Sequence, residues 1–329
     1  MREIDTDKFS ASLREKSINV STKRVLITRL AGSEQEQDIS EPTNCDGFGR
    51  VRHFKRQTTA GWPENPLPID PASFRLGIKP SDMLRAQVFQ NAVCNWRCWY
   101  CYVPFSLLAG RLKHSAWFTA VELIDLYLGI KDAPKMIDLS GGQPDLTPEW
   151  IVWMMKELEA RGLADKVYLW SDDNLSNDYL LRYVSREDLE YMRQHRMYGK
   201  VCCFKGFDEQ SFAFNTNAAP ALFSRQFEVF KSHLPLGLDL YGYATFTSPK
   251  NDNVKGAMIS FVDKLQRIHH NLPLRTIPLE IRSFSAMKDR NDENAIVTQS
   301  QAIEQWNLEI EKRYSPDERR RPIYEVPLT

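Results

Sequence analysis

Three cysteines lie close together in the segment "NAVCNWRCWYCYV", residues 91–103, with the spacing C-x3-C-x2-C. They are Cys94, Cys98 and Cys101, and no fourth cysteine is nearby. Thiolates are soft ligands that select iron–sulfur clusters, zinc or copper(I). A closed structural zinc site normally uses two separated pairs of ligands, and the chain has no second pair. Three thiolates from one loop would leave one position of a metal centre open to another molecule.

A cube-shaped 4Fe–4S cluster fits this pattern, because it needs one ligand for each iron and would have one iron free. Two alternatives remain: thiols buried without a metal, or a zinc site completed by a distant histidine. The other cysteines are Cys45 and the adjacent pair Cys202 and Cys203. The side chains of the adjacent pair would point to opposite faces of a strand.

The composition limits the class of protein. The chain has 329 residues, is 42% hydrophobic and carries 43 basic and 43 acidic residues, so its net charge offers no general attraction to nucleic acid. No apolar stretch follows the charged start "MREIDTDKF", and no run approaches the roughly 20 apolar residues that cross a bilayer. These features predict a soluble, cytoplasmic protein without membrane contact.

From about residue 82, short β-prone runs alternate with amphipathic helical segments. The predicted strands are "RAQVFQNAV", "KMIDLSGG", "KVYLWSD", "KVCCFKG", "LDLYGYATFTS" and "IPLEIRSFS". Thr119 and Glu122 form a capping box before one helix, and Ser185 caps another. Such alternation indicates a parallel sheet with helices outside, either doubly wound or barrel-like. Ligands bind at the carboxyl ends of strands in both folds, and the cysteines directly follow the first strand.

A second segment, "DLSGGQPDL" at residues 138–146, follows the second predicted strand. Gly141 and Gly142 would let the backbone approach a ligand closely, and Pro144 would fix the exit of the chain. A simple turn is the alternative interpretation.

These two segments together resemble the radical S-adenosylmethionine superfamily. Its signature is C-x3-C-x2-C with an aromatic residue before the last cysteine, here Tyr100, which could shield the cluster from water. Gly141, Gly142, Gln143 and Pro144 resemble its glycine-glycine-glutamate-proline segment, whose backbone carbonyls face the amino group of S-adenosylmethionine; Gln143 replaces the usual glutamate.

The resemblance implies an α/β fold, a partial (β/α)6 TIM-like barrel, and one 4Fe–4S cluster held by the three cysteines. S-adenosylmethionine would chelate the fourth iron. Its reductive cleavage would give a 5′-deoxyadenosyl radical that takes hydrogen from a substrate, and a reductant such as flavodoxin or ferredoxin would supply the electron. No further cysteine cluster indicates a second iron–sulfur centre.

Two later segments are similar to parts of pyruvate formate-lyase activating enzymes. The first, "VCCFKGFDEQSF", places Lys205 where the family's lysine pairs with the methionyl carboxylate or ribose oxygens. The second, "YLWSDDNLS", supplies candidates for contacts to the ribose or carboxylate, which are equally common as helix caps and turn residues: Ser171, Asp172, Asp173 and Asn174. In the sixth predicted strand, Glu280 or Arg282 could also reach the site.

The expected organisation has three parts. Residues 1–81, polar and proline-rich with one strand candidate "RVLITRL", form an extension that packs on the core. Residues 82–290 form the core domain, and 291–329 a C-terminal helical segment and tail.

The substrate is not identified by the sequence. The first hypothesis is a small or peptide-linked substrate. The second is a glycyl-radical-enzyme activase acting on a partner protein, and the third is an RNA-modifying enzyme, for which "RVRHFKR" at 50–56 and "ERRRP" at 318–322 are the basic hints. A non-enzymatic iron–sulfur or zinc protein would not need the segment "SGGQP" after its second strand.

Overall fold

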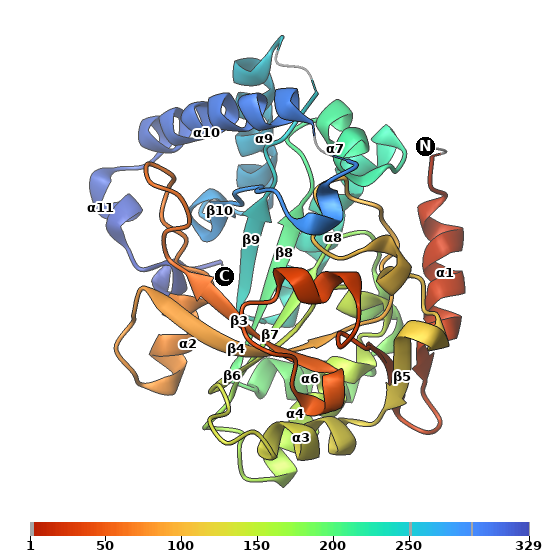
Figure 1. Cartoon of the computed structure of the whole chain (residues 1–329). Helices are drawn as coiled ribbons and strands as arrows, with labels where there is room; N and C mark the ends of the chain where they lie inside the picture. The colour runs from red at the N-terminus through yellow and green to blue at the C-terminus, as the bar shows by residue number, and fades with distance from the viewer. Residues whose placement is uncertain (1–2, 250–251, 291, 329) are drawn as a thin grey trace.

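The computed structural model describes residues 3–249, 252–290 and 292–328. Its centre is a curled seven-stranded sheet with the strand order β10-β9-β8-β7-β6-β4-β3 (Figure 1). The strands from β4 to β10 are parallel, and β3 pairs antiparallel with β4 at the edge. The strands are β3 (Gly49–Lys55), β4 (Met83–Gln90), β6 (Met136–Ser140), β7 (Tyr168–Asp173), β8 (Tyr198–Phe204), β9 (Leu240–Ala244) and β10 (Thr276–Pro278).

Helices lie between successive parallel strands and cover the outer face of the sheet. They are α3 (Ala120–Leu128), α4 (Glu149–Ala160), α5 (Tyr179–Tyr183), α6 (Arg186–Gln194), α7 (Glu209–Thr216), α8 (Phe223–His233) and α9 (Val254–Ile268). Six parallel strands with helical crossovers make a half-open barrel, which confirms the predicted partial (β/α)6 architecture.

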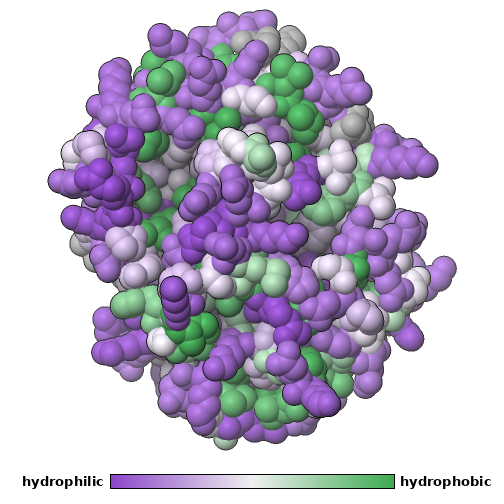
Figure 2. Space-filling model, turned by 60° about the vertical axis from the view of Figure 1, so that its left-hand side comes forward, coloured by the Kyte–Doolittle hydropathy of each residue, from purple (hydrophilic) through white to green (hydrophobic). Residues whose placement is uncertain are grey.

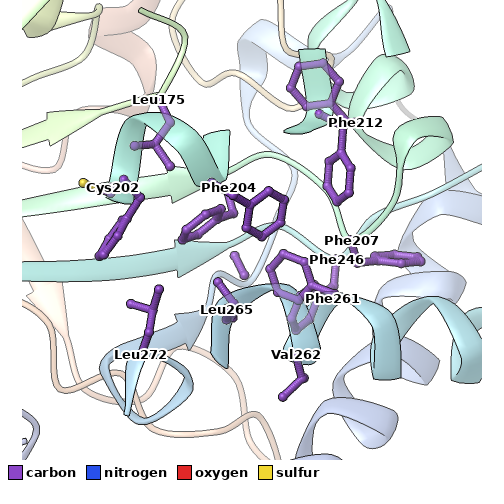
Figure 3. Close-up of a cluster of buried hydrophobic side chains, with 14 of the residues drawn as sticks. Leu175, Cys202, Phe204, Phe207, Phe212, Phe246, Phe261, Val262, Leu265 and Leu272 are labelled. Carbon is purple, nitrogen blue, oxygen red and sulfur yellow. The ribbon is translucent and has the colours of Figure 1, made fainter. Parts of the chain in front are cut away.

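The two faces of the sheet carry separate apolar cores. On the outer face, Phe204 packs with Phe246 and Phe261 in a cluster that also includes residues of α8 and α9 (Figure 3). On the inner face, Trp170 and Tyr241 pack with residues of α2 (Ile69–Leu76). Since both faces are buried, the strand β8 is buried along its whole length.

The N-terminal residues contribute further elements around this sheet. Helix α1 (Thr6–Ser17) is tied to α4 by an ion pair between Arg14 and Glu149. A small antiparallel sheet contains β1 (Ile18–Asn19), β2 (Arg24–Thr28) and β5 (Ser115–Phe118). At the other end of the chain, α10 (Glu293–Arg313) packs on α9 and is followed by α11 (Pro316–Arg320). The domain boundaries themselves stay a prediction.

Local signals explain several element ends. Thr119 and Glu122 form the predicted capping box of α3. The sixth predicted strand is too long, because β10 ends at Pro278. Glu280 and Arg282 therefore lie after the last strand and not in it. The amide of Leu279 still donates to the carbonyl of Ala244 in β9, at 2.8 Å, but the amide of Ile281 donates to the Gln299 side chain of α10, with N···O 2.7 Å.

On the face shown in Figure 2, apolar side chains are scattered among polar ones. Among the described residues, no helix combines the length and the apolar character needed to span a bilayer.

Candidate active site

The predicted site residues gather at the carboxyl ends of four neighbouring strands. Residues 91–103, here called the cysteine loop, follow β4, and residues 140–144, here called the glycine turn, end β6 and follow it. Gln90 of β4 pairs with Ser140 of β6, so the loop and the turn start side by side. Asp173 ends β7 and Lys205 directly follows β8. Parallel pairing thus brings segments more than a hundred residues apart to one edge of the sheet.

The three thiols of the cysteine loop are free and partly buried. Burial and the neighbouring Cys94 and Cys101 raise the pKa of Cys98 to about 12, against an opposing effect of Lys205. Burial and Cys94 likewise raise the pKa of Cys101 to about 11. Thiols in such surroundings stay protonated in the absence of a metal, because a thiolate would be poorly solvated. Binding a metal is the event that would deprotonate them.

The three sulfurs of the loop do not all lie as close together as the ligands of a single zinc ion. Among the described residues, the group whose ligand atoms all lie within 4.8 Å of one another is Asp173, Cys202 and His233, and not the three cysteines. Sulfur ligands of one tetrahedral zinc would lie about 3.8 Å apart, given Zn–S bonds of about 2.3 Å. A 4Fe–4S cluster holds each thiolate on a different iron and spreads them further. The donor set therefore fits a cluster.

Arg290 closes the cysteine loop from the C-terminal side. Its guanidinium donates to the carbonyl oxygens of Cys98, at 3.2 Å, and Cys101, at 3.0 Å, and lies 4.1 Å from the centre of the Phe105 ring. These bonds fix the backbone between the second and third cysteines. Sequence reasoning missed Arg290, because nothing local shows that a residue 189 positions beyond Cys101 returns to the loop.

The glycine turn packs directly on the backbone of the cysteine loop. A Cβ atom on Gly142 would lie 2.3 Å from the carbonyl oxygen of Asn91 and 2.4 Å from that of Val93. Gly141 has φ +87°, a conformation that favours glycine. The amide of Gln143 donates to the carbonyl of Val93 with N···O 2.7 Å. Gly142 is thus required by the contact between the two segments, and Gly141 by its backbone conformation, whatever ligand is bound.

The side chain of Gln143 has a role that its departure from the family pattern did not predict. Its amide nitrogen donates to Asp173 Oδ1 at 2.9 Å, and its amide oxygen accepts from the backbone N–H of Asn174, also at 2.9 Å. An ionised glutamate could accept but could not donate to a carboxylate. Gln143 therefore joins the glycine turn to the end of β7. Pro144 opens the short 3-10 turn Pro144–Leu146 that leads into α4.

The four candidate residues at the end of β7 have different surroundings. Ser171 and Asp173 are fully buried, where Ser171 bonds the hydroxyl of Tyr198 at 2.7 Å. Asn174 reaches the cysteine loop, with its Nδ2 donating to Asn95 Oδ1 at 2.9 Å and lying 3.9 Å from Cys94 Sγ. Asp172 is the one that faces the charged inner wall of the barrel.

The inner wall brings charges from several strands together. Arg52 of β3 donates to Asp138 Oδ2 of β6 at 3.2 Å. Burial and the charge of Asp138 raise the pKa of Asp172 to about 7, with Arg52 opposing. Arg50 lies beside the Tyr102 hydroxyl at 3.4 Å. Sequence reasoning did not select Arg52 or Asp138; the alternation of polar and apolar residues in "MIDLS" is the signal that could have shown Asp138 facing the interior.

Lys205 lies at the junction of this wall and the cysteine loop. Its ammonium group is 5.8 Å from the centre of the Tyr100 ring, and the Tyr100 hydroxyl is 3.1 Å from Thr245 Oγ1 of the segment after β9. Burial alone would lower the pKa of Lys205, but the acidic groups of Cys203, Tyr100 and Cys98 outweigh it and raise this pKa well above its usual value. Lys205 is thus a cation held beside the thiols.

No known family model matches the sequence, and no curated protein matches it. Among solved structures, the fold is similar to that of SuiB from Streptococcus suis. SuiB bound to its precursor peptide SuiA gives a TM-score of 0.47 at 14% identity, over 68% of this chain and 46% of SuiB. SuiB bound to S-adenosylmethionine gives a TM-score of 0.35 at 15% identity, over 55% of this chain and 35% of SuiB. The chain therefore covers less than half of SuiB.

Proposed function

We propose that the protein is a radical S-adenosylmethionine enzyme that binds one 4Fe–4S cluster through Cys94, Cys98 and Cys101. The observation that carries the proposal is the contact between the cysteine loop and the glycine turn. Three free thiols stand beside a turn in which Gly142 leaves no room for a Cβ. A cluster with one free iron and an exposed backbone edge next to it are the two parts that binding of S-adenosylmethionine requires.

When bound, the cluster and S-adenosylmethionine supply a 5′-deoxyadenosyl radical that abstracts hydrogen from a substrate, given one electron from a donor such as flavodoxin or ferredoxin. The carbonyls of Gly141 and Gly142 would accept from the amino group of the cofactor. Lys205 would pair with its carboxylate, as an ammonium held beside the loop can do. Asp172 and Asn174 would accept from the ribose hydroxyls.

Other residues would exclude water and hold the ligands in place. Tyr100 lies buried between Lys205 and Thr245, and Arg290 covers the loop with Phe105. Water exclusion matters because it strengthens charge interactions inside a site and protects reactive species.

For the substrate, we favour a small or peptide-linked molecule over nucleic acid. In the two basic segments several arginines pair with acids, which reduces the positive charge free for nucleic acid: Arg56 with Asp70, Arg319 with Glu311, and Arg320 with Asp317. The inner wall, with Arg52, Asp138 and Asp172, instead suits a substrate that carries both a positive and a negative group.

The test is anaerobic reconstitution with iron and sulfide, reduction, addition of S-adenosylmethionine, and chromatography for 5′-deoxyadenosine. The wild type should hold about four irons per chain and produce 5′-deoxyadenosine. Cys98→Ala should do neither, whereas Cys45→Ala, which removes a buried thiol outside the loop, should behave as wild type. The proposal fails if the wild-type protein takes up zinc but no iron, or if Cys98→Ala produces as much 5′-deoxyadenosine as wild type.

A further inference from the structure

A second group of metal-ligating side chains lies on the outer face of the sheet, beneath α8. Asp173 comes from the end of β7, Cys202 from β8 and His233 from the last turn of α8. All three side chains are fully buried. Cys203 belongs to the core of the opposite face, as expected from the alternation along a strand, and Figure 3 shows Cys202 at the edge of the outer apolar cluster. The group contains none of the three loop cysteines.

Several buried polar atoms around this group have no hydrogen-bond partner among the described residues. They are Asp173 Oδ2, Asp145 Oδ2 and both ring nitrogens of His233. A buried polar atom without a partner costs about 1–3 kcal/mol, so native proteins rarely collect so many in one place. An occupant that interacts with these atoms would remove the penalty.

Hydrogen bonds within the protein occupy one carboxylate oxygen of Asp173 and leave the other near His233. Its Oδ1 accepts from Gln143 at 2.9 Å and from the backbone N–H of Leu175 at 2.8 Å. Its Oδ2 lies 3.8 Å from His233 Nδ1 and 3.8 Å from Lys200 Nζ. Lys200 is itself bound to Asp145 Oδ1 at 2.6 Å, and this ion pair neutralises its charge locally.

The donor set is that of a transition-metal site. A carboxylate oxygen, a thiol sulfur and an imidazole nitrogen all lie within 4.8 Å of one another. Ligands of one tetrahedral zinc, with bonds of about 2.0–2.3 Å, would lie roughly 3.3–3.7 Å apart. The 3.8 Å between Asp173 Oδ2 and His233 Nδ1 is close to that range. The pairs that include Cys202 lie within 4.8 Å, so their atoms would approach one another by up to about 1 Å when a metal binds.

We propose that Asp173, Cys202 and His233 supply three ligands to one divalent transition metal, zinc in the first instance, and that water takes the fourth position. The metal would fasten α8 to the ends of β7 and β8. Because Asp173 also holds the side chain of Gln143, the same metal would fix the glycine turn from behind. As the site is fully buried, the metal would enter during folding.

The test uses the full chain with Cys94, Cys98 and Cys101 all changed to alanine, so that no metal can bind to the cysteine loop. This protein is refolded with zinc, or with cobalt as a spectroscopic probe, dialysed and analysed for bound metal. We expect about one metal per chain and, with cobalt, the absorption of a cobalt–thiolate bond. Adding Cys202→Ala should lower bound metal at least tenfold, whereas adding Cys203→Ala, on the other face of β8, should leave it unchanged.

Two results would overturn the proposal: no stoichiometric zinc or cobalt in the triple variant, or metal that is retained in full after Cys202→Ala and after His233→Gln. In the first case the unpartnered atoms are satisfied by water. If Cys202→Ala does not fold by circular dichroism, Cys202→Ser keeps the side-chain size and must still lose the cobalt–thiolate band. The variant without the three loop cysteines makes this result independent of the proposed enzymatic activity.

Discussion

Gly142→Ala should separate the glycine turn from the cysteine loop. The new Cβ would lie 2.3 and 2.4 Å from two backbone carbonyl oxygens, of Asn91 and Val93. Carbon and carbonyl oxygen atoms in ordinary contact lie about 3.3 Å or more apart, so the two segments must move about 1 Å. Neither oxygen can turn away as a flexible side chain would.

The magnitude follows from two contributions. Forcing an extra carbon into a packed interior costs about 1–3 kcal/mol. The movement also stretches the hydrogen bond from Gln143 to the carbonyl of Val93, which is 2.7 Å long, and the loss of one such bond costs about 1 kcal/mol. Gly142→Ala should therefore lower the free energy of unfolding by about 2–4 kcal/mol.

Urea unfolding of the metal-free protein measures this change, and Gly129→Ala is the matched control. Gly129 ends a helix with φ −71°, and its added Cβ would be 3.4 Å from the nearest atom, so alanine should change stability by less than about 0.5 kcal/mol. After reconstitution, Gly142→Ala should also hold less iron. Equal unfolding midpoints and equal iron in the two variants would refute the close contact between the turn and the loop.

Three further predictions concern side chains of the same site. Gln143→Glu replaces a donor to Asp173 by a second carboxylate and should destabilise the metal-free protein by about 2–4 kcal/mol at pH 7, measured by urea unfolding; wild-type stability would contradict the role of the amide. Arg290→Ala removes two bonds to loop carbonyls, so a chelator should strip iron from it faster, with Arg290→Lys intermediate; equal rates would count against the closure. In the folded chain the pKa of Asp172 rises from 3.8 to about 7, so the folded state binds more protons and stability falls as pH rises between about 4 and 7. Asp172→Asn should reduce this fall by at most about 4 kcal/mol, measured by unfolding across that pH range, and an unchanged pH profile would contradict it.

The local parts of the site could be predicted from the sequence. The cysteine spacing and the two glycines lie in contiguous segments, and each follows a strand that its own residues indicate. Lys205 could be placed because it ends a strong β-prone run. The fold followed from the alternation of strands and helices, which limits the topology to a few arrangements.

The rest depends on contacts that only the folded chain reveals. Arg52 reaches Asp138 because β3, from the N-terminal part, adds an antiparallel strand beside β4. Arg290 arrives from a segment after the last strand. The overlong prediction of that strand has a physical cause, since "IPLEIRSFS" has β propensity beyond Pro278 but its Ile281 amide bonds a helix side chain instead of a strand. The β propensity depends on the residues of the segment alone, whereas the hydrogen-bond partner of its backbone decides the structure.

Two neighbouring cysteines of β8 belong to different parts of the molecule, because they point to opposite faces of the sheet. Cys202 and Cys203 were expected on opposite faces, and they lie in different cores. Which cysteine points to the outer face could not be predicted from the sequence, because a strand that is buried on both faces has no polar side to mark its orientation. Gln143 links the faces: its backbone holds the cysteine loop, and its side chain holds Asp173 on the α8 side. A substitution of His233 therefore acts on the outer group directly and, through Asp173 and Gln143, on the glycine turn.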